Sequence, residues 1–415
     1  MMKKNLLLIC LLFFAFAFSV LNAEARNIEI PVYFITDREV KTSDSKIGLT
    51  NKRAKEGKLS FGKIRVVVAL PEKGQLLNEH KELGWRFTNV KPETICDLEL
   101  LKAEDTEDFL KKHVKAPTMA NIYIHGFATT FPGDAKYMAN LSRDLEQPVI
   151  AFSWASYGAI HPLPTAARDL RVLSLGADAT YSWDLRSSEE CSADFYNVLD
   201  SIKDPSKVRI IAHSMGNRLL YLALRKRYDI LMGSTKVKIQ RTKRPLSEII
   251  ARYKENGKWP DVANVFDRKN QEALVKRLDE LERTKPIPKF AQMVMVSADL
   301  NLDDFQEYFV QFTSSAKKLV LFVNFEDSAL GFSMVANNTP HRLGRKLLGP
   351  VEKALLKTFV CEHLAIDPLG HQISANLLAN IIKSDGRVAG PDIISERRTI
   401  MSNKCEYILL KKKKS

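Results

Sequence analysis

The stretch RIIAHSMGNRLL, residues Arg209–Leu220, decides how this sequence folds. An apolar run leads into AHSMG (212–216), and residues with good helix propensity follow. This order predicts a strand, a sharp turn and a helix. The related pattern G-x-S-x-G presents a nucleophilic serine, because small flanking residues avoid collisions in a strained turn. Taken alone, the stretch also fits an ordinary serine at the start of a helix.

Apolar strand-like runs alternate with helical patterns on both sides of this turn, as repeated βαβ units do. The expected strands are 27–40, 58–71, 120–126, 148–154, 208–214, 291–299, 317–327 and 357–364. The expected helices are 132–145, 187–202, 217–228, 302–312 and a last one beginning near His371. The pattern predicts an α/β fold with a mostly parallel sheet. The remainder, including RVAGPDIISERR (387–398), is expected to be peripheral.

The first 25 residues have the layout of a secretory signal peptide. Two lysines precede the unbroken apolar run Leu6–Phe18, and Ala23-Glu24-Ala25 offers a cleavage site. The alternative is a membrane anchor, but the run is shorter than the roughly 18 residues that span a bilayer. We therefore expect a cleaved signal (1–25), an exported protein that is periplasmic or secreted, and one mature domain (26–415).

Residues 230–289 interrupt the alternation of strands and helices with a strongly charged, helical stretch. It predicts a helical insertion above the sheet, which serves either as a lid or as a charged excursion. The formal net charge is +14, concentrated in Lys236–Arg244 and Lys411–Lys414. Such runs usually form a solvated face, and the sharper interpretation is binding to an anionic membrane or wall polymer. No aromatic residues interleave with the lysines, so no nucleic-acid partner is expected.

The cysteines and the missing ligand motifs exclude several classes of site. Signal cleavage leaves four cysteines, which permit one or two disulfides in an oxidising compartment, although buried free thiols fit equally well. Their spacing does not fit a zinc site. The sequence contains no metal-ligand cluster and no nucleotide-binding loop, so no metal and no cofactor is predicted.

If Ser214 is a nucleophile, its chemistry needs two fixed N–H donors for an oxyanion. One is expected from Met215, directly after the serine, and the other from the loop after an earlier strand. The loop in YIHGF supplies it: Gly126 lets the backbone turn, and Phe127 or the next residue, Ala128, presents its N–H. His125 is expected to brace this loop by hydrogen bonds.

A base and an acid are expected downstream of Ser214, in the order Ser, Asp or Glu, His. Asp327 comes where a predicted strand ends, and His371 lies beyond the following one. Both therefore reach the carboxyl edge of the sheet, where the imidazole would take the serine proton and the carboxylate would orient it. His213 should pack behind the turn. Three rivals are weighed for acid or base: Asp299, Glu326 and His363.

Several motifs, in this order along the chain, resemble the alpha/beta-hydrolase superfamily, and its lipase- and esterase-like bacterial branch catalogued as a domain of unknown function. They are PVYFITDREV, LSFGKIRVVVALP, IHGFATTFPGDA, FSWASYG, AHSMGNRLL, VSADLNLDDF, FEDSALGFS, HRLGR and LGHQ. The resemblance implies a mostly parallel, eight-stranded sheet with helices on both faces, and a Ser214-Asp327-His371 triad. It also implies that Trp154 and Ser156 line the pocket with His125 and Gly126.

These observations predict an exported serine hydrolase that cleaves carboxylic esters through an acyl-enzyme, with a small-molecule or lipid ester as substrate. Amide or thioester cleavage would use the same groups. A different class also fits: a catalytically silent hydrolase-fold protein that binds an anionic surface through its lysine-rich segments.

Overall fold

The computed structural model describes about three fifths of the chain, in the ranges that follow. They are 27–43, 46–54, 58–69, 95–116, 118–156, 170–232, 276, 280, 283–284, 288–307, 312, 315–337, 342–345, 356–362, 371–384, 393–400 and 405–412. The expected signal peptide (1–25), the rival base His363 and most of the expected insertion (230–289) lie outside these residues. Among the described residues, no helix is long and apolar enough to cross a membrane.

The strands, in chain order, are β1 (Asn27–Thr36), β2 (Arg38–Ser43), β3 (Lys46–Arg53), β4 (Ser60–Ala69), β5 (Ile95–Leu101), β6 (Ala120–Ile124), β7 (Val149–Ser153), β8 (Val208–His213), β9 (Gln292–Val296), β10 (Leu319–Val323), β11 (Leu356–Glu362), β12 (Ile393–Ile400) and β13 (Cys405–Lys412). The helices are α2 (Thr106–Phe109), α3 (Phe131–Leu145), α4 (Leu170–Ser201), α5 (Gly216–Met232), α8 (Leu302–Glu307), α10 (Ser328–Ala336) and α11 (Ala375–Lys383), with short helical turns at Leu110–Val114, Pro205–Lys207 and Leu343–Arg345.

The main sheet confirms the predicted mostly parallel arrangement. Its order is β12-β13-β11-β10-β9-β8-β6-β7-β1-β4-β5, and the eight neighbouring strands from β13 to β1 all run parallel. Antiparallel pairing adds β4 and β5 at one edge and β12 at the other. The sheet in the described residues therefore has eleven strands, three more than the expected eight.

The C-terminal region corrects one expectation. Residues 393–400 and 405–412 are not peripheral: β13 pairs in parallel with β11, and β12 closes the edge against β13. The run of polar residues SERRT (395–399) is typical of a surface segment. An edge strand needs only one neighbour and exposes more polar residues than a central one, so the sequence pattern was misleading.

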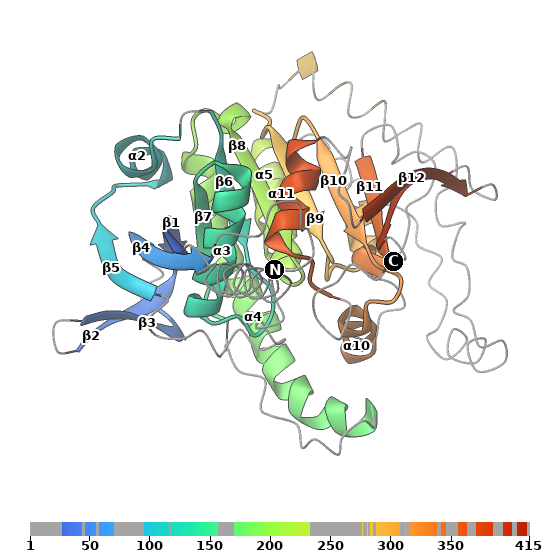
Figure 1. Ribbon diagram of the computed structural model, residues 1–415, viewed down its shortest axis with the longest axis horizontal. Helices are drawn as coiled ribbons and strands as arrows, with labels where there is room; N and C mark the ends of the chain where they lie inside the picture. Colours follow the sequence, from blue (N-terminus) through green and yellow to red (C-terminus); the bar gives the residue numbers. More distant parts are fainter. Residues whose placement is uncertain are drawn as a thin grey trace, which may run out of the picture.

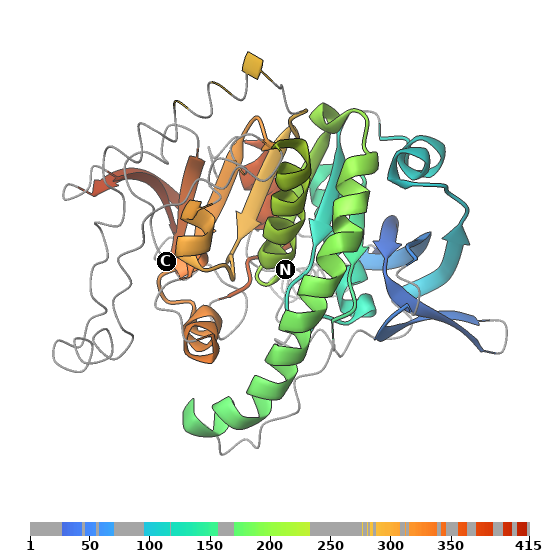
Figure 2. The same cartoon turned by 180° about the vertical axis from the view of Figure 1, so that it is seen from behind.

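Helices cover both faces of the sheet (Figures 1 and 2). Helices α3 and α11 lie on the face toward the viewer in Figure 1, and α4 and α5 lie on the other, seen in Figure 2. Successive residues of β8 point to opposite cores: Ile210 and Ala212 pack on the α4–α5 side, and Ile211 packs on the α3–α11 side. Burial on both faces explains the unbroken apolar runs of the central strands.

Parallel strands place the sequence motifs at one edge of the sheet. The carboxyl ends of β6, β8, β10 and β11 lead into the loops that carry the predicted oxyanion donors, nucleophile, acid and base. Helix α11 begins at Ala375, later than expected, because the Ser374 hydroxyl accepts the N–H of Leu377 as an N-terminal cap. Cys191 on α4 is a buried free thiol.

Candidate active site

The turn at Ser214 has the strained backbone that its sequence predicts. Its φ is 52°, a left-handed conformation that costs a non-glycine residue on the order of 1–2 kcal/mol. Three backbone hydrogen bonds hold it: the Ser214 N–H donates to Val296 O (2.9 Å), and the Ser214 carbonyl accepts from Asp299 N (3.1 Å) and Asn217 N (3.0 Å). Neighbouring strand β9 thus fixes the point where β8 ends and α5 begins.

Two glycines allow other backbone segments to approach this turn closely. A Cβ on Gly216 would lie 2.6 Å from the carbonyl oxygens of Ile124 and His125 at the end of β6. A Cβ on Gly126 would lie 2.8 Å from the Cβ of Ser214. The second glycine of the serine motif and the glycine of the HGF loop are therefore required by the same close approach.

The acid and the base predicted from strand order contact each other. His371 Nδ1 lies 2.7 Å from Asp327 Oδ2, and the Asp327 side chain is fully buried while 15% of the His371 side chain is exposed. The other carboxylate oxygen of Asp327 accepts the N–H of Leu330 at 2.9 Å, in the first turn of α10. A buried carboxylate at Nδ1 fixes the orientation of the imidazole.

The segment after β9 connects this pair to the nucleophile turn. Val296 binds the N–H of Ser214, and the hydroxyl of the next residue, Ser297, donates to the His371 carbonyl at 2.6 Å. The ring of His213, adjacent to Ser214, lies 5.0 Å from the ring of His371 between centroids. The structure therefore brings Ser214, His371 and, through it, Asp327 to one place.

Neither of the two described rival groups makes the contact with His371. The Asp299 carboxylate accepts from the hydroxyls of Tyr181 (2.7 Å) and Ser333 (2.5 Å) and forms a buried ion pair with Arg342 (3.2 Å). Glu326 has an exposed side chain next to the buried Asp327. The geometry thus assigns the contact with the histidine to Asp327.

His213 remains neutral behind the turn. It is 9% exposed, and its Nε2 lies 3.5 Å from the His371 carbonyl. Burial, with smaller contributions from the nearby His371 and His125 rings, lowers the pKa of His213 to about 3. A ring that stays uncharged over the neutral range adds no positive charge beside the base.

The backbone N–H groups of the predicted oxyanion donors differ from that of Ala128 in their hydrogen bonding. Within the described residues, the N–H groups of Met215 and Phe127 donate to no acceptor. The N–H of Ala128, the alternative donor, is bound to Asp184 Oδ2 at 2.8 Å. Among the two candidates in the HGF loop, Phe127 therefore retains an available N–H.

Side chains expected in the pocket support this loop from behind. His125 Nδ1 lies 2.9 Å from the Gly126 carbonyl, and Trp154 Nε1 donates to the His125 carbonyl at 2.9 Å. Their rings stack with centroids 4.9 Å apart. The Ser156 hydroxyl accepts the N–H of Thr129 at 3.1 Å. Trp154 and Ser156 expose no surface, so in this structure they contact the loop rather than an open cavity.

Two buried charged residues that the sequence did not single out complete the support. Arg38, at the start of β2, donates from Nη2 to the Thr129 carbonyl (3.0 Å) and from Nε to the Ser153 hydroxyl (3.1 Å). Asp184, on α4, binds Ala128 and Ser156. Arg38 lies in the TDRE part of the first motif, which was the available signal. Asp184 belongs to no motif that we recognised.

The Arg38 guanidinium is surrounded by carboxylates. Burial lowers the pKa of Arg38, and the charges of Asp37, Asp134 and Asp184 oppose that shift. Asp134 is 2% exposed and neither of its carboxylate oxygens has a hydrogen-bond partner among the described residues. Burial raises the pKa of Asp134 to about 8. A neutral carboxyl therefore sits beside the cation near pH 7.

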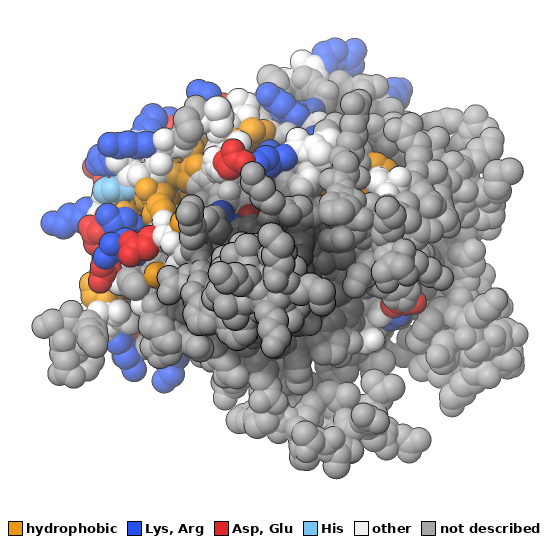
Figure 3. Space-filling model, viewed as in Figure 1, with side chains coloured by type: hydrophobic (Ala, Val, Ile, Leu, Met, Phe, Trp, Pro, Cys, Tyr) orange, Lys and Arg blue, Asp and Glu red, His pale blue; other side chains and the backbone are white. Residues whose placement is uncertain are grey.

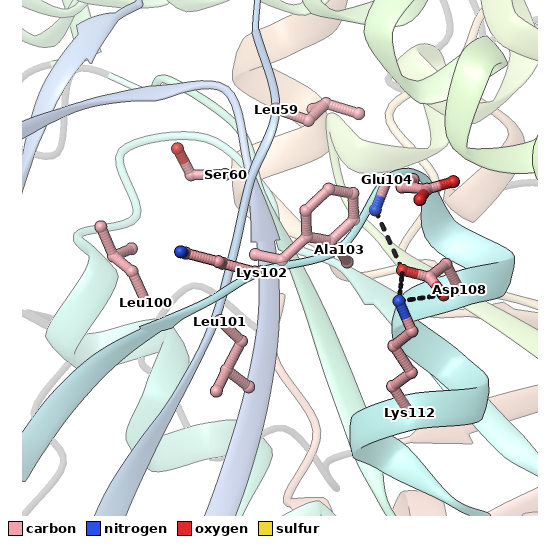
Figure 4. Close-up of a pocket in the computed structure, with 10 residues that line it drawn as sticks. Leu59, Ser60, Leu100, Leu101, Lys102, Ala103, Glu104, Asp108 and Lys112 are labelled. Carbon is pink, nitrogen blue, oxygen red and sulfur yellow. Dashed lines mark hydrogen bonds and ion pairs between the residues drawn. The ribbon is translucent and has the colours of Figure 1, made fainter.

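A separate groove of about 440 Å³ lies at the β4–β5 edge (Figure 4). It is lined by Leu59, Ser60, Phe61, Leu100, Leu101, Lys102, Ala103, Glu104, Asp108 and Lys112. The Asp108 carboxylate contacts Lys112 Nζ and the Glu104 N–H on one side of it. Charged side chains gather at this end of the molecule (Figure 3). The groove includes none of the predicted site residues.

Three of the solved structures similar to this chain are esterases, each at low identity. A hyperthermophilic esterase from the archaeon Pyrobaculum calidifontis is 10% identical over 88% of this chain and 72% of that chain, with a TM-score of 0.21. Esterase LipW from Mycobacterium marinum is 12% identical over 90% and 74%, with a TM-score of 0.21. A bacterial heroin esterase is 11% identical over 91% and 78%, with a TM-score of 0.21. Scores this low support no statement about fold or activity.

No curated protein sequence matches the chain. A family model does: the one described as alpha/beta hydrolase of unknown function (DUF900) matches residues 102–360. The match covers more than half of the chain, including Ser214 and Asp327, and ends before His371. The parallel sheet, the serine turn and this match agree with one another, and the chain belongs to the alpha/beta hydrolases of unknown function (DUF900).

Proposed function

We propose that the protein is a serine hydrolase that cleaves carboxylic esters through an acyl-enzyme. The single observation that supports this most is the contact between His371 and the buried Asp327, held through Ser297 next to the turn that presents Ser214. A buried carboxylate on Nδ1 keeps the proton there and leaves Nε2 as the base.

In the proposed reaction, Ser214 Oγ attacks the ester carbonyl carbon and its proton passes to His371 Nε2. The carbonyl oxygen becomes an oxyanion, which the N–H groups of Met215 and Phe127 stabilise. The C–O bond to the alcohol breaks, and the leaving oxygen takes the proton from His371. Water then attacks the acyl-enzyme with the same base and releases the acid.

The nucleophile is tested with a fluorophosphonate, which forms a covalent adduct with an activated serine. Wild type is expected to label stoichiometrically and to hydrolyse p-nitrophenyl acetate, and Ser214→Ala is expected to do neither. A matched control is Ser188→Ala, because Ser188 is buried in α4 and its hydroxyl bonds only to the helix carbonyl of Leu185 in the described contacts. Equal labelling of wild type and Ser214→Ala would contradict the assignment.

The substrate class and the cellular location need experiments of their own. Matched ester, thioester and amide substrates with one acyl group would rank the three reactions, and the ester is expected to be fastest. Export, a lid formed by the insertion, and attraction of Lys236–Arg244 to anionic surfaces stay predictions from the sequence. If the wild-type protein is not labelled by the fluorophosphonate but binds anionic vesicles in a salt-sensitive way, the result favours a catalytically silent binding protein instead.

A further inference from the structure

We infer that Asp184 is a positioning residue for the oxyanion loop, acting through Ser156. The inference rests on the proposed function and adds a residue to it. Asp184 lies on α4, has no exposed surface, and is 30 residues before the nucleophile in the chain. Its carboxylate reaches the segment that follows the Phe127 donor.

Asp184 and Ser156 hold the loop by hydrogen bonds, and we call this pair of side chains the latch. Two of the hydrogen bonds end on the same carboxylate oxygen of Asp184. Oδ2 accepts the N–H of Ala128 at 2.8 Å and the hydroxyl of Ser156 at 2.6 Å. The Ser156 oxygen in turn accepts the N–H of Thr129 at 3.1 Å. Two consecutive backbone N–H groups of the loop are therefore bound, one directly and one through a serine.

The conformation of the loop makes this support necessary. Ala128 has a φ of 53°, in the left-handed region that alanine rarely adopts. The small side chain of Ala128 does not stabilise that conformation. The hydrogen bond from its N–H to the buried Asp184 carboxylate does. A charged acceptor makes a stronger hydrogen bond than a neutral one.

The latch reaches the donor itself through Thr129. The Thr129 hydroxyl donates to the Gly126 carbonyl at 3.1 Å, and the His125 ring contacts the same oxygen. The peptide between Gly126 and Phe127 is trans and planar, so its N–H points away from its carbonyl. Fixing the Gly126 oxygen on the buried side therefore directs the Phe127 N–H away from that side.

The role predicts a loss in kcat with little change in KM, because a misdirected donor affects the charge that develops in the transition state. For Asp184→Ala we expect kcat for p-nitrophenyl acetate to fall about 10- to 100-fold. Phenylboronic acid, whose tetrahedral adduct places an oxygen at the oxyanion position, should bind more weakly by a similar factor. Asp184→Asn retains an acceptor oxygen and should recover most of kcat.

Asp194→Ala is the matched control on the same helix. Asp194 is also a buried aspartate of α4, and it accepts a hydrogen bond from Arg53 Nη2 at 2.5 Å with no contact to the loop. Its variant is expected to lose thermal stability and to keep wild-type kcat. A purely structural role for Asp184 would instead make the two alanine variants lose activity in proportion to their loss of stability.

The outcomes separate the two proposals. Active wild type with unchanged kcat and boronate affinity in Asp184→Ala overturns the positioning role alone. Wild type that neither labels with fluorophosphonate nor hydrolyses esters overturns both. If Asp184→Ala does not fold, Ser156→Ala decides: a drop in kcat at constant KM supports the latch, and unchanged kcat overturns it.

Discussion

The loop after β6 and the described segment that begins at His371 both lie beside the turn at Ser214, but they are held in different ways. The first is bound by Asp184, Arg38 and Ser156, none of which has exposed surface. In the second, His371 is bound at its carbonyl by Ser297 and at its ring by Asp327, and part of its side chain is exposed.

The difference matches the two tasks that the proposed function gives these segments. Oxyanion donors must be fixed before charge develops, because reorienting them during the reaction would cost free energy. A general base must receive a proton from one oxygen and deliver it to another, so one side of its ring has to face the substrate. Buried charges suit the first task, and a partly exposed ring with one buried carboxylate suits the second.

The largest expected effect comes from the base side. His371→Ala should lower kcat by about 10⁴- to 10⁶-fold, and Asp327→Asn by about 10⁴-fold, because the first removes the base and the second its orientation. Steady-state kinetics with p-nitrophenyl acetate measures both. Glu326→Gln is the control: its exposed side chain adjoins Asp327, and kcat should stay at the wild-type value. A larger loss of kcat in Glu326→Gln than in Asp327→Asn would mean that the acid is misassigned.

The next effect tests the neutral carboxyl beside Arg38. The pKa of Asp134 is about 8 in the folded protein, against an ordinary value of 3.8. Because the folded value is higher, stability present below pH 3.8 is lost as the pH rises toward 8. Asp134→Asn removes this dependence, so by pH 7 it should be more stable than wild type by about 4 kcal/mol, on the scale of about 1.4 kcal/mol per pH unit. Urea unfolding at pH 4 and 7 measures it, and a constant difference between the proteins would contradict it.

Gly126→Ala should disturb the loop after β6 and the turn at Ser214 at once. The added Cβ would lie 2.8 Å from Ser214 Cβ and 3.1 Å from His213 Nδ1. The loop or the nucleophile turn has to move, and we expect kcat to fall about 100-fold, equivalent to about 3 kcal/mol. Gly48→Ala is the control, since its Cβ would have 4.0 Å to the nearest atom. Wild-type kcat in Gly126→Ala would show that the loop is looser than its hydrogen bonds indicate.

The smallest expected effect concerns acid pH. The pKa of His213 is about 3 in the folded protein and 6.5 when exposed. Because the folded value is lower, stability present above pH 6.5 is lost as the pH falls toward 3. At pH 5 this amounts to about 2 kcal/mol relative to pH 7. Urea unfolding of wild type and His213→Asn over this pH range measures the contribution, as the difference between the two free energies of unfolding. If the two pH dependences coincide, the ring lies in a more hydrated environment than the structure shows.

Local sequence patterns were sufficient for the parts of the site that are local. The strand, turn and helix around Ser214 follow from an apolar run and small residues on either side of the serine. The order of the predicted strands, with the expected order of serine, acid and base, placed Asp327 and His371 at one edge of the sheet, and the two side chains contact each other. These features depend on periodicity and on which edge of a parallel sheet a loop reaches, and both can be read along one chain.

The support behind the oxyanion loop could not be predicted in the same way. Arg38 binds a carbonyl 91 residues away, and Asp184 binds an N–H 56 residues away. A charged residue in a sequence resembles a solvent-exposed one until its partners are known, and the partners come from separate elements. The edge pair β12–β13 was missed for a related reason, because the sequence does not show which neighbour a polar strand will find.

The position of β8 in the sheet affects how the protein would lose activity on heating. In the order of described strands β8 is sixth of eleven, so five strands lie between it and each edge. Opening that begins at β5 or β12 has to disrupt several ladders before the amides of β8 exchange with solvent. Amide exchange at Ile210 and Ile211 should therefore report the global stability, and fraying of either edge should leave the nucleophile in place.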